Sequence, residues 1–204
     1  MSPTQMMKEL AAPVVSDQRI FSFSTAICRN KNVFVTEEYC AALTRALKQM
    51  ETTMDLCNLA YVIMPNYFSW MFKASPKKND PRQVYGELKK NVAREILTNL
   101  MMEVKNRDAG FKVLDFFKSK KISRPRPEKI LAEFKDEAKK FEGRKFKVWQ
   151  KGGRLKEVAT KGDLAKEVEY LKTRPMAGKV KLVDKPEEYP YLFISDELEK
   201  ELLN

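Results

Sequence analysis

The sequence predicts a fold of the α+β class, in which strands and helices alternate along the chain and pack around a shared core. Two patterns support this: short segments whose apolar residues recur at every second position, and longer ones whose apolar residues recur every three or four. Of the 204 residues, 43% are hydrophobic and 10% are aromatic, which is enough for one good core or two small ones. A disordered chain is therefore not expected.

The first half of the chain predicts a strand, a helix and two further strands. Residues 19–27 alternate with period two and form the first strand. Thr36 is a suitable N-cap for an amphipathic helix that runs from Glu37 to near Cys57. Residues 59–64 then indicate a buried strand, and residues 67–73, after the Pro65-Asn66 break, continue it or pair with it.

The second half begins with the strongest helix signal in the chain. Asp80 followed by Pro81 opens a helix to about Lys105, and its core stripe is Val84, Leu88, Val92, Ile96 and Leu100. Residues 106–126 are expected to be irregular and basic. The remaining expected elements are a charged helix over residues 127–142 that Gly143 stops, a strand over residues 145–150, and a helix capped by Asp163 that runs to about Lys172.

Positive charge is concentrated in the middle of the chain. The formal net charge is +11, from 39 Lys and Arg against 28 Asp and Glu. Residues 1–72 hold 6 basic and 6 acidic residues, residues 73–157 hold 25 and 12 (net +13), and residues 158–204 hold 8 and 10 (net −2). A polyanion selects such a segment, because Lys and Arg neutralise phosphates and release counterions. The alternative is a solvated surface that keeps the protein soluble.

The composition also argues against several classes of protein. The longest apolar stretches, such as residues 59–64, are far too short to span a bilayer, and the N-terminus lacks a basic start and a long apolar run. Cys28, Cys40 and Cys57 have no CxxC spacing, and the chain has no histidine to complete a zinc site. We expect a soluble, unexported protein with no membrane partner and with reduced core cysteines.

Three segments carry a resemblance to a known family. They are residues 59–66 (LAYVIMPN), residues 146–152 (FKVWQKG) and the region from Tyr170 to Tyr191 with its Pro175 and Ala177-Gly178. In this order and spacing they resemble the single-tyrosine transposases of the HUH endonuclease superfamily, in particular the REP-associated tyrosine transposases. The resemblance implies a ferredoxin-like βαββαβ fold, an antiparallel sheet flanked by helices, with an added helical C-terminal region.

The resemblance implies a metal site at residues 67–69. Family members have two histidines there, on the same side of a strand, and these hold a divalent cation that polarises the scissile phosphate. This chain has Tyr67, Phe68 and Ser69. Because a phenol and a hydroxyl are poor ligands at neutral pH, we expect no metal, and Mg or Mn only if the site is active. The plainer interpretation is an ordinary sheet surface, with Phe68 and Trp70 packed on the other side.

The resemblance also implies a position for the nucleophilic tyrosine, on the helix after those strands. Residues 89–96 (KKNVAREI) match that segment, with Asn91 at the tyrosine position. An amide cannot form a phosphotyrosine intermediate, so no catalytic residue is expected. Glu95 matches a position that can supply a further metal ligand, although a surface partner for Lys or Arg is the plainer interpretation. Neither Tyr67 nor Tyr85 is placed to replace the nucleophile.

The segment after Trp149-Gln150 is basic, where the family usually has aromatic and acidic residues. A basic surface suits contact with phosphate without cutting. Trp149 itself is interpreted as core, with stacking on an unpaired base as the alternative. For each basic residue the alternative is a solvated charge. The candidate DNA-binding residues are Lys89, Lys90, Arg94, Arg144, Lys145, Lys151 and Arg154.

The resemblance further implies a domain plan and a partner. Residues 19–195 are expected to form one transposase-like domain with a basic helical insertion at about 106–143, between an N-terminal extension (1–18) and a C-terminal tail (196–204). Family members bind imperfect DNA hairpins and adjacent single-stranded bases, often as dimers, so DNA and a possible homodimer are the expected partners. A prokaryotic cytoplasm is the expected location, with association to the nucleoid when DNA is bound.

Three functions remain open. The leading hypothesis is a catalytically inactive, transposase-like protein that binds hairpin or single-stranded DNA. The second is an active transposase or nickase that uses noncanonical residues. The third is a protein-interaction module on a transposase scaffold, with its charge serving an acidic protein.

Overall fold

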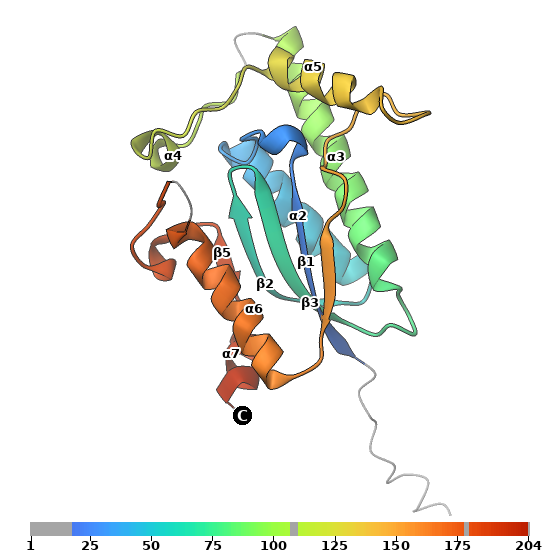
Figure 1. The fold of residues 1–204 in the computed structure, drawn as a ribbon, viewed down its shortest axis with the longest axis vertical. Coiled ribbons are helices and arrows are strands. Elements are labelled where there is room, and N and C mark those ends of the chain that lie inside the picture. Colours follow the sequence, from blue (N-terminus) through green and yellow to red (C-terminus); the bar gives the residue numbers. More distant parts are fainter. Residues whose placement is uncertain (1–17, 107–109, 178–179, 204) are drawn as a thin grey trace, which may run out of the picture.

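The protein is built on a five-stranded antiparallel sheet, seen in a computed structural model that describes residues 18–106, 110–177 and 180–203 (Figure 1). The strand order is β4-β1-β3-β2-β5, and each neighbouring pair is antiparallel. The strands are β1 (Arg19–Ala26), β2 (Cys57–Met64), β3 (Tyr67–Ala74), β4 (Arg154–Val158) and β5 (Leu192–Ile194). The predicted N-terminal extension lies almost wholly outside the described residues.

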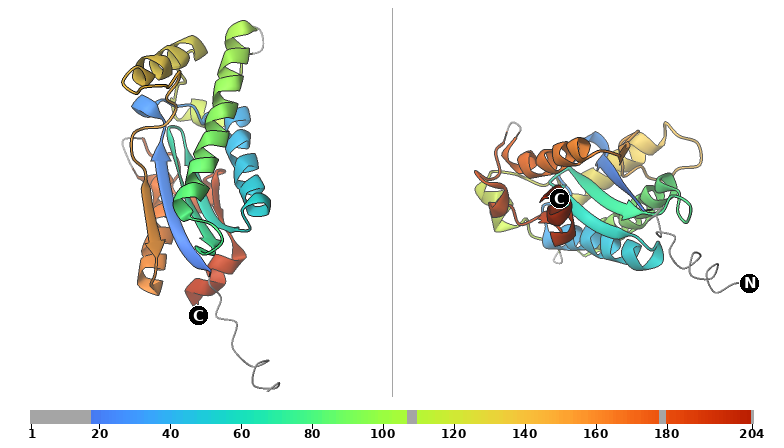
Figure 2. Two further views of the ribbon diagram at one scale, coloured as in Figure 1. Left: turned by 90° about the vertical axis from the view of Figure 1, so that its right-hand side faces the viewer. Right: turned by 90° about the horizontal axis from the view of Figure 1, so that it is seen from below.

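Helices cover both faces of the sheet (Figure 2). Helices α2 (Glu37–Thr53) and α3 (Pro81–Lys105) lie on one face, and α6 (Lys161–Thr173) lies on the other. Helix α5 (Pro127–Ala138) packs against α3. The order β1-α2-β2-β3-α3-β4 is the ferredoxin-like βαββαβ arrangement, so the predicted α+β class is confirmed. The helices are α2 (Glu37–Thr53), α3 (Pro81–Lys105), α4 (Asp115–Ser119), α5 (Pro127–Ala138), α6 (Lys161–Thr173) and α7 (Asp196–Leu203), with short 3₁₀ turns η1 (Cys28–Asn30), η3 (Arg174–Met176) and η4 (Pro186–Glu188).

Alternation along β3 divides its side chains between the two faces. Phe68 and Trp70 are fully buried in the cluster that includes the apolar residues of α2 and α3. Met71 belongs to the second cluster, which includes the apolar residues of α6, and Tyr67 packs against that cluster. Because successive strand residues point to opposite sides, Tyr67, Ser69 and Met71 share the α6 face.

Helix α3 follows its sequence signal closely. The side chain of Asp80 accepts a hydrogen bond from the amide of Arg82 at 2.9 Å, as expected of an N-cap residue before Pro81. The predicted stripe is fully buried: Val84, Leu88, Val92, Ile96 and Leu100. The opposite side of the helix is therefore free to carry charge.

The expected strand over residues 145–150 does not form. Lys147, Val148 and Trp149 are buried in succession, and an isolated bridge to Ile27 is the one strand-like contact that Trp149 makes in the described part of the chain. Gly152 then turns the chain at a φ of 84°, in the left-handed region that favours glycine, and β4 begins only at Arg154. The prediction of a strand over residues 145–150 was therefore wrong, and the strand of this region is β4, which the sequence did not indicate.

Further differences lie at helix ends and near the C-terminus. The helix α6 is capped by Thr160, which accepts a hydrogen bond from the amide of Asp163, rather than by Asp163 itself. The side chain of Thr36 makes no capping hydrogen bond, although α2 begins directly after it. Residues 196–203, expected as a tail, form α7, whose Leu198 is fully buried.

The basic segment at residues 110–126, expected to be irregular, is held by a buried ion pair. An Nη atom of Arg124 lies 2.6 Å from a carboxylate oxygen of Glu103 at the end of α3, and the two side chains are 5% and 1% exposed. The hydroxyl of Tyr39 and the amide of Phe111 also donate to this carboxylate. Residues 110–126 are therefore fixed against α2 and α3, although α4 is their one short helix in the described ranges.

The cysteine prediction is consistent with the structure. Cys28 and Cys40 are buried, Cys57 is partly buried, and all three are free thiols. Within the described ranges, no helix has the length and apolar character needed to cross a membrane.

Candidate nucleic-acid interface

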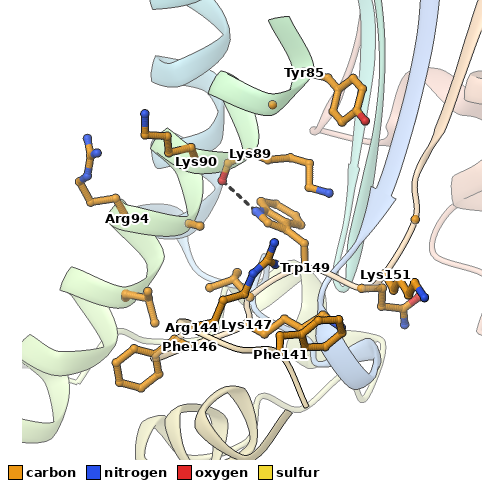
Figure 3. A pocket seen from close by; sticks show the side chains of 16 residues that line it. Tyr85, Lys89, Lys90, Arg94, Phe141, Arg144, Phe146, Lys147, Trp149 and Lys151 are labelled. Carbon is orange, nitrogen blue, oxygen red and sulfur yellow. Dashed lines mark hydrogen bonds between the residues drawn. The ribbon is translucent and has the colours of Figure 1, made fainter. Parts of the chain in front are cut away.

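A cavity of about 830 Å³ lies between α3 and the segment of residues 141–152 (Figure 3). Helix α3 contributes one wall, with three basic residues at or near its outward side, and the chain before β4 contributes the other. No Asp or Glu among the described residues lines it. Its basic lining residues are Lys89, Lys90, Arg94, Arg144, Lys147 and Lys151.

Aromatic side chains form much of the remaining wall. Tyr85 stacks on Phe23 of β1, with ring centroids 4.8 Å apart, and Phe146 is half-buried. The indole of Trp149 donates a hydrogen bond to the backbone carbonyl of Lys89 at 2.8 Å, which ties the two walls together (Figure 3). Because Trp149 is 7% exposed and lies edge-on to Phe68, it belongs to the core rather than to a stacking surface.

The basic side chains of this cavity influence one another. Burial lowers the pKa of Lys89 below its ordinary value, and the charges of Arg144 and Lys147 lower it further. Lys147 is itself buried, with its ammonium 3.8 Å from the ring centroid of Phe141 and 3.7 Å from a carboxylate oxygen of Glu137. Lys89 and Arg144 form no ion pair with a described residue, so the cavity keeps a positive charge that favours an anionic ligand.

Five of the seven predicted DNA-binding residues line this cavity. Lys145 does not: it is exposed and lies with its ammonium 6.0 Å from the ring of Phe146. Arg154 lies in β4 and pairs with Glu167 of α6 at 2.6 Å. Lys147 was missed, because the expected strand gave no reason to place a lysine in the core.

The predicted catalytic positions do not lie in one cleft. Tyr67 and Ser69 face α6, whereas α3, which carries Asn91 and Glu95, packs on the opposite face of the sheet (Figure 2). Glu95 pairs with Arg45 of α2 at 3.1 Å, which is the plainer interpretation that the sequence allowed. Asn91 and Glu95 therefore do not converge with Tyr67 and Ser69 on one cleft, and the match of Asn91 to the nucleophile position stays a prediction from the resemblance.

Two residues that the sequence had not singled out as site residues lie beside Tyr67. The Nε–H of Arg174 donates a hydrogen bond to the hydroxyl of Tyr67, and the guanidinium carbon also lies 5.1 Å from the ring centroid of Tyr170. Burial raises the pKa of Tyr67 above its ordinary value, although the bond from Arg174 acts in the opposite direction. The one feature of the sequence that could have indicated this contact is the spacing of Tyr170 and Arg174, four residues apart, which places them on the same face of a helix.

The residues at this position do not fit a divalent metal ion. The described residues contain no group of three His, Cys, Asp or Glu side chains that could hold one. The donors near Tyr67 are a phenol and a serine hydroxyl, and a guanidinium already lies against the phenol. A permanent cation beside weak neutral ligands opposes the binding of a second cation.

The chain matches no protein-family model and no curated protein. Among solved structures, it is similar to a REP-associated tyrosine transposase bound to a REP hairpin, with a TM-score of 0.51 and 11% sequence identity. The similarity covers 85% of this chain and 75% of that one. The chain therefore has a distant, transposase-like fold, as the three sequence segments had indicated.

Proposed function

We propose that the protein binds hairpin or single-stranded DNA through the basic cavity between α3 and residues 141–152. The observation that carries this proposal is the convergence of six Lys and Arg side chains on a cavity whose described lining includes no carboxylate. A charged surface that served solubility alone would have acidic and basic residues interspersed. The solved transposase of similar fold is itself bound to a DNA hairpin, which supports the same class of ligand.

The shape and lining of the cavity favour a nucleic acid over a small anion. Lys90 and Arg94 extend from α3 toward solvent, whereas Lys89 reaches inward above Trp149 (Figure 3). The positive charges of the cavity are thus spread from its rim to its floor, so that they can neutralise more than one phosphate along a nucleic-acid backbone. The half-buried rings of Tyr85 and Phe146 add apolar surface against which an unpaired base can pack.

We further propose that binding occurs without cutting. The chain contains no histidine, and Arg174 occupies the space beside Tyr67 where a metal ion would be needed. The test is to incubate the protein with labelled hairpin DNA and Mg²⁺ or Mn²⁺. We expect intact DNA and no covalent adduct. A nicked product would instead establish an active transposase or nickase. In that case Tyr170 would be the first residue to replace, since it lies beside Tyr67.

Binding is tested by fluorescence anisotropy with three labelled ligands of equal length: a hairpin, a single strand and a fully paired duplex. We expect the affinity for the hairpin or the single strand to fall steeply as salt rises, with a log–log slope of about −0.7 to −0.9 per phosphate contacted. An acidic polypeptide of matched charge is the control. If it binds as well as DNA, or if no DNA binds at low salt, the proposal fails in favour of a protein-interaction module.

A further inference from the structure

A second, smaller cavity of about 350 Å³ lies on the α6 face of the sheet. Tyr67, Tyr170 and Arg174 form part of its wall, together with the β1 residues Ser24 and Thr25. It shares Gln150, Lys151 and Gly152 with the basic cavity, so the two lie on either side of this short segment. Its described lining also contains no carboxylate.

Arg174 is held in this cavity in one orientation. Its guanidinium carbon lies 4.8 Å from the ring centroid of Tyr67 and 5.1 Å from that of Tyr170. The Nε–H donates to the hydroxyl of Tyr67, which fixes the plane of the group. Within the described ranges, the two Nη groups have no hydrogen-bond partner and form no ion pair. A guanidinium with its orientation fixed and its Nη donors unused is suited to a planar or tetrahedral oxyanion.

The surrounding charges leave this cavity positive. Lys151 is exposed and forms no ion pair with a described residue. The buried carboxylate of α6 belongs to Glu167, and its two oxygens accept bonds from Arg154 and from the hydroxyl of Ser22, at 2.6 and 2.9 Å. Glu169 is exposed, and within the described ranges Arg174 forms no ion pair with a carboxylate.

We infer that this cavity is a metal-independent site for a phosphate group, with Arg174 as its principal ligand and Lys151 as a second cation. The guanidinium provides permanent positive charge where Tyr67 and Ser69 offer no metal ligand. The phosphate can belong to DNA or be a free ion. Assigning it to DNA rests on the proposed function, because the DNA strand would then pass from the basic cavity over Gln150–Gly152 to Arg174.

The first experiment uses the full chain and inorganic phosphate alone. The ¹⁵N resonance of the Arg174 Nε–H group, assigned by its loss in an Arg174→Lys variant, is followed during a titration with phosphate. We expect a saturating shift that sodium chloride of equal ionic strength does not reproduce. Equal shifts with both salts, or no shift at all, would overturn the site.

The second experiment identifies the source of the phosphate. Arg174→Gln is compared with Arg45→Gln, which removes one charge from an exposed position outside both cavities, after circular dichroism has shown that both variants fold. A loss of about tenfold in hairpin affinity for Arg174→Gln alone assigns the phosphate to DNA. Unchanged hairpin affinity with a phosphate-specific shift assigns it to a free ion. If the wild-type protein binds no hairpin, the proposed function fails, and the phosphate titration still decides the site.

Discussion

Two parts of the basic segment 73–157 use positive charge in opposite ways. Arg124 is buried and donates from both Nη groups to Glu103, with the hydroxyl of Tyr39 at the same carboxylate. In the basic cavity, by contrast, Lys89 and Arg144 face each other across a space that no described carboxylate lines. The same local excess of Lys and Arg therefore fixes the fold in one place and leaves charge available to a ligand in the other.

The difference shows that pairing, not charge count, distinguishes a binding surface from a structural one. Burying a cation beside a carboxylate satisfies both and leaves nothing for a partner. Lys89 instead lies partly buried with no ion pair to a described residue, and burial together with the charges of Arg144 and Lys147 lowers its pKa. We expect an anion that enters the cavity to offset the repulsion among these cations.

The largest expected effect is on stability, when the buried pair is broken. Glu103→Ala leaves Arg124 buried without its carboxylate, and we expect the free energy of unfolding to fall by about 3–5 kcal/mol. Urea denaturation measures this loss. The double variant Glu103→Leu with Arg124→Met should recover much of it, because apolar residues can replace a buried pair. A loss below about 1 kcal/mol for Glu103→Ala would show that the pair does not hold residues 110–126.

The basic cavity should respond in the opposite sense, with a large effect on binding and a small one on stability. Replacing Lys89, Arg94 and Arg144 together by Gln is expected to weaken hairpin binding by about 100-fold and to flatten the log–log salt slope by up to about 0.9 for each phosphate that the variant no longer neutralises. Anisotropy at several salt concentrations measures both. A matched variant that replaces the exposed Lys48, Lys161 and Lys166 by Gln, outside both cavities, should change affinity only slightly. Equal reductions in affinity for the two variants would mean that net charge alone drives binding.

The sequence predicted the part of the basic cavity that helix α3 forms. The stripe of α3 placed Lys89, Lys90 and Arg94 outside the core, because helical periodicity is a local property. Periodicity could not show which face of the sheet α3 covers, so it could not show that the sheet separates Asn91 from Tyr67. The contact of Tyr67 with Arg174 joins residues 107 positions apart, and only the packing of α6 creates it.

The core residues of the strands were predictable because alternation is also a local property, whereas the start of β4 was not. Alternation in β1 and β3 identified the face that carries Phe23 and Trp70, since a sheet has only two sides. The position of β4 was not predictable, because it depends on Gly152 at a positive φ and on the close approach of Gly153 to β1, where an added Cβ would lie 3.2 Å from the ring of Phe23. A tertiary contact thus decides where that strand begins.

A smaller effect is expected from pH, again at the buried pair. Burial alone would raise the pKa of Glu103, but hydrogen bonds from Arg124, the amide of Phe111 and Tyr39 outweigh it and lower the pKa below its usual value. A carboxyl whose pKa is depressed by folding contributes stability above its unfolded pKa of about 4.3, and this is lost as the pH falls through the folded value. The unfolding free energy should therefore decline more steeply below about pH 4.3 in the wild type than in Glu103→Gln. Parallel profiles would contradict the depressed pKa.

The smallest effect is expected at an ion pair that is neither buried nor part of a cavity. Arg45 and Glu95 are paired at 3.1 Å between α2 and α3, with side chains 62% and 42% exposed. Because solvent screens such a pair, Glu95→Gln should change the unfolding free energy by less than about 1 kcal/mol and leave hairpin affinity unaltered. Urea denaturation and anisotropy on one preparation measure both quantities. A marked loss of DNA binding in Glu95→Gln would instead show that this side of α3 belongs to the DNA-binding surface.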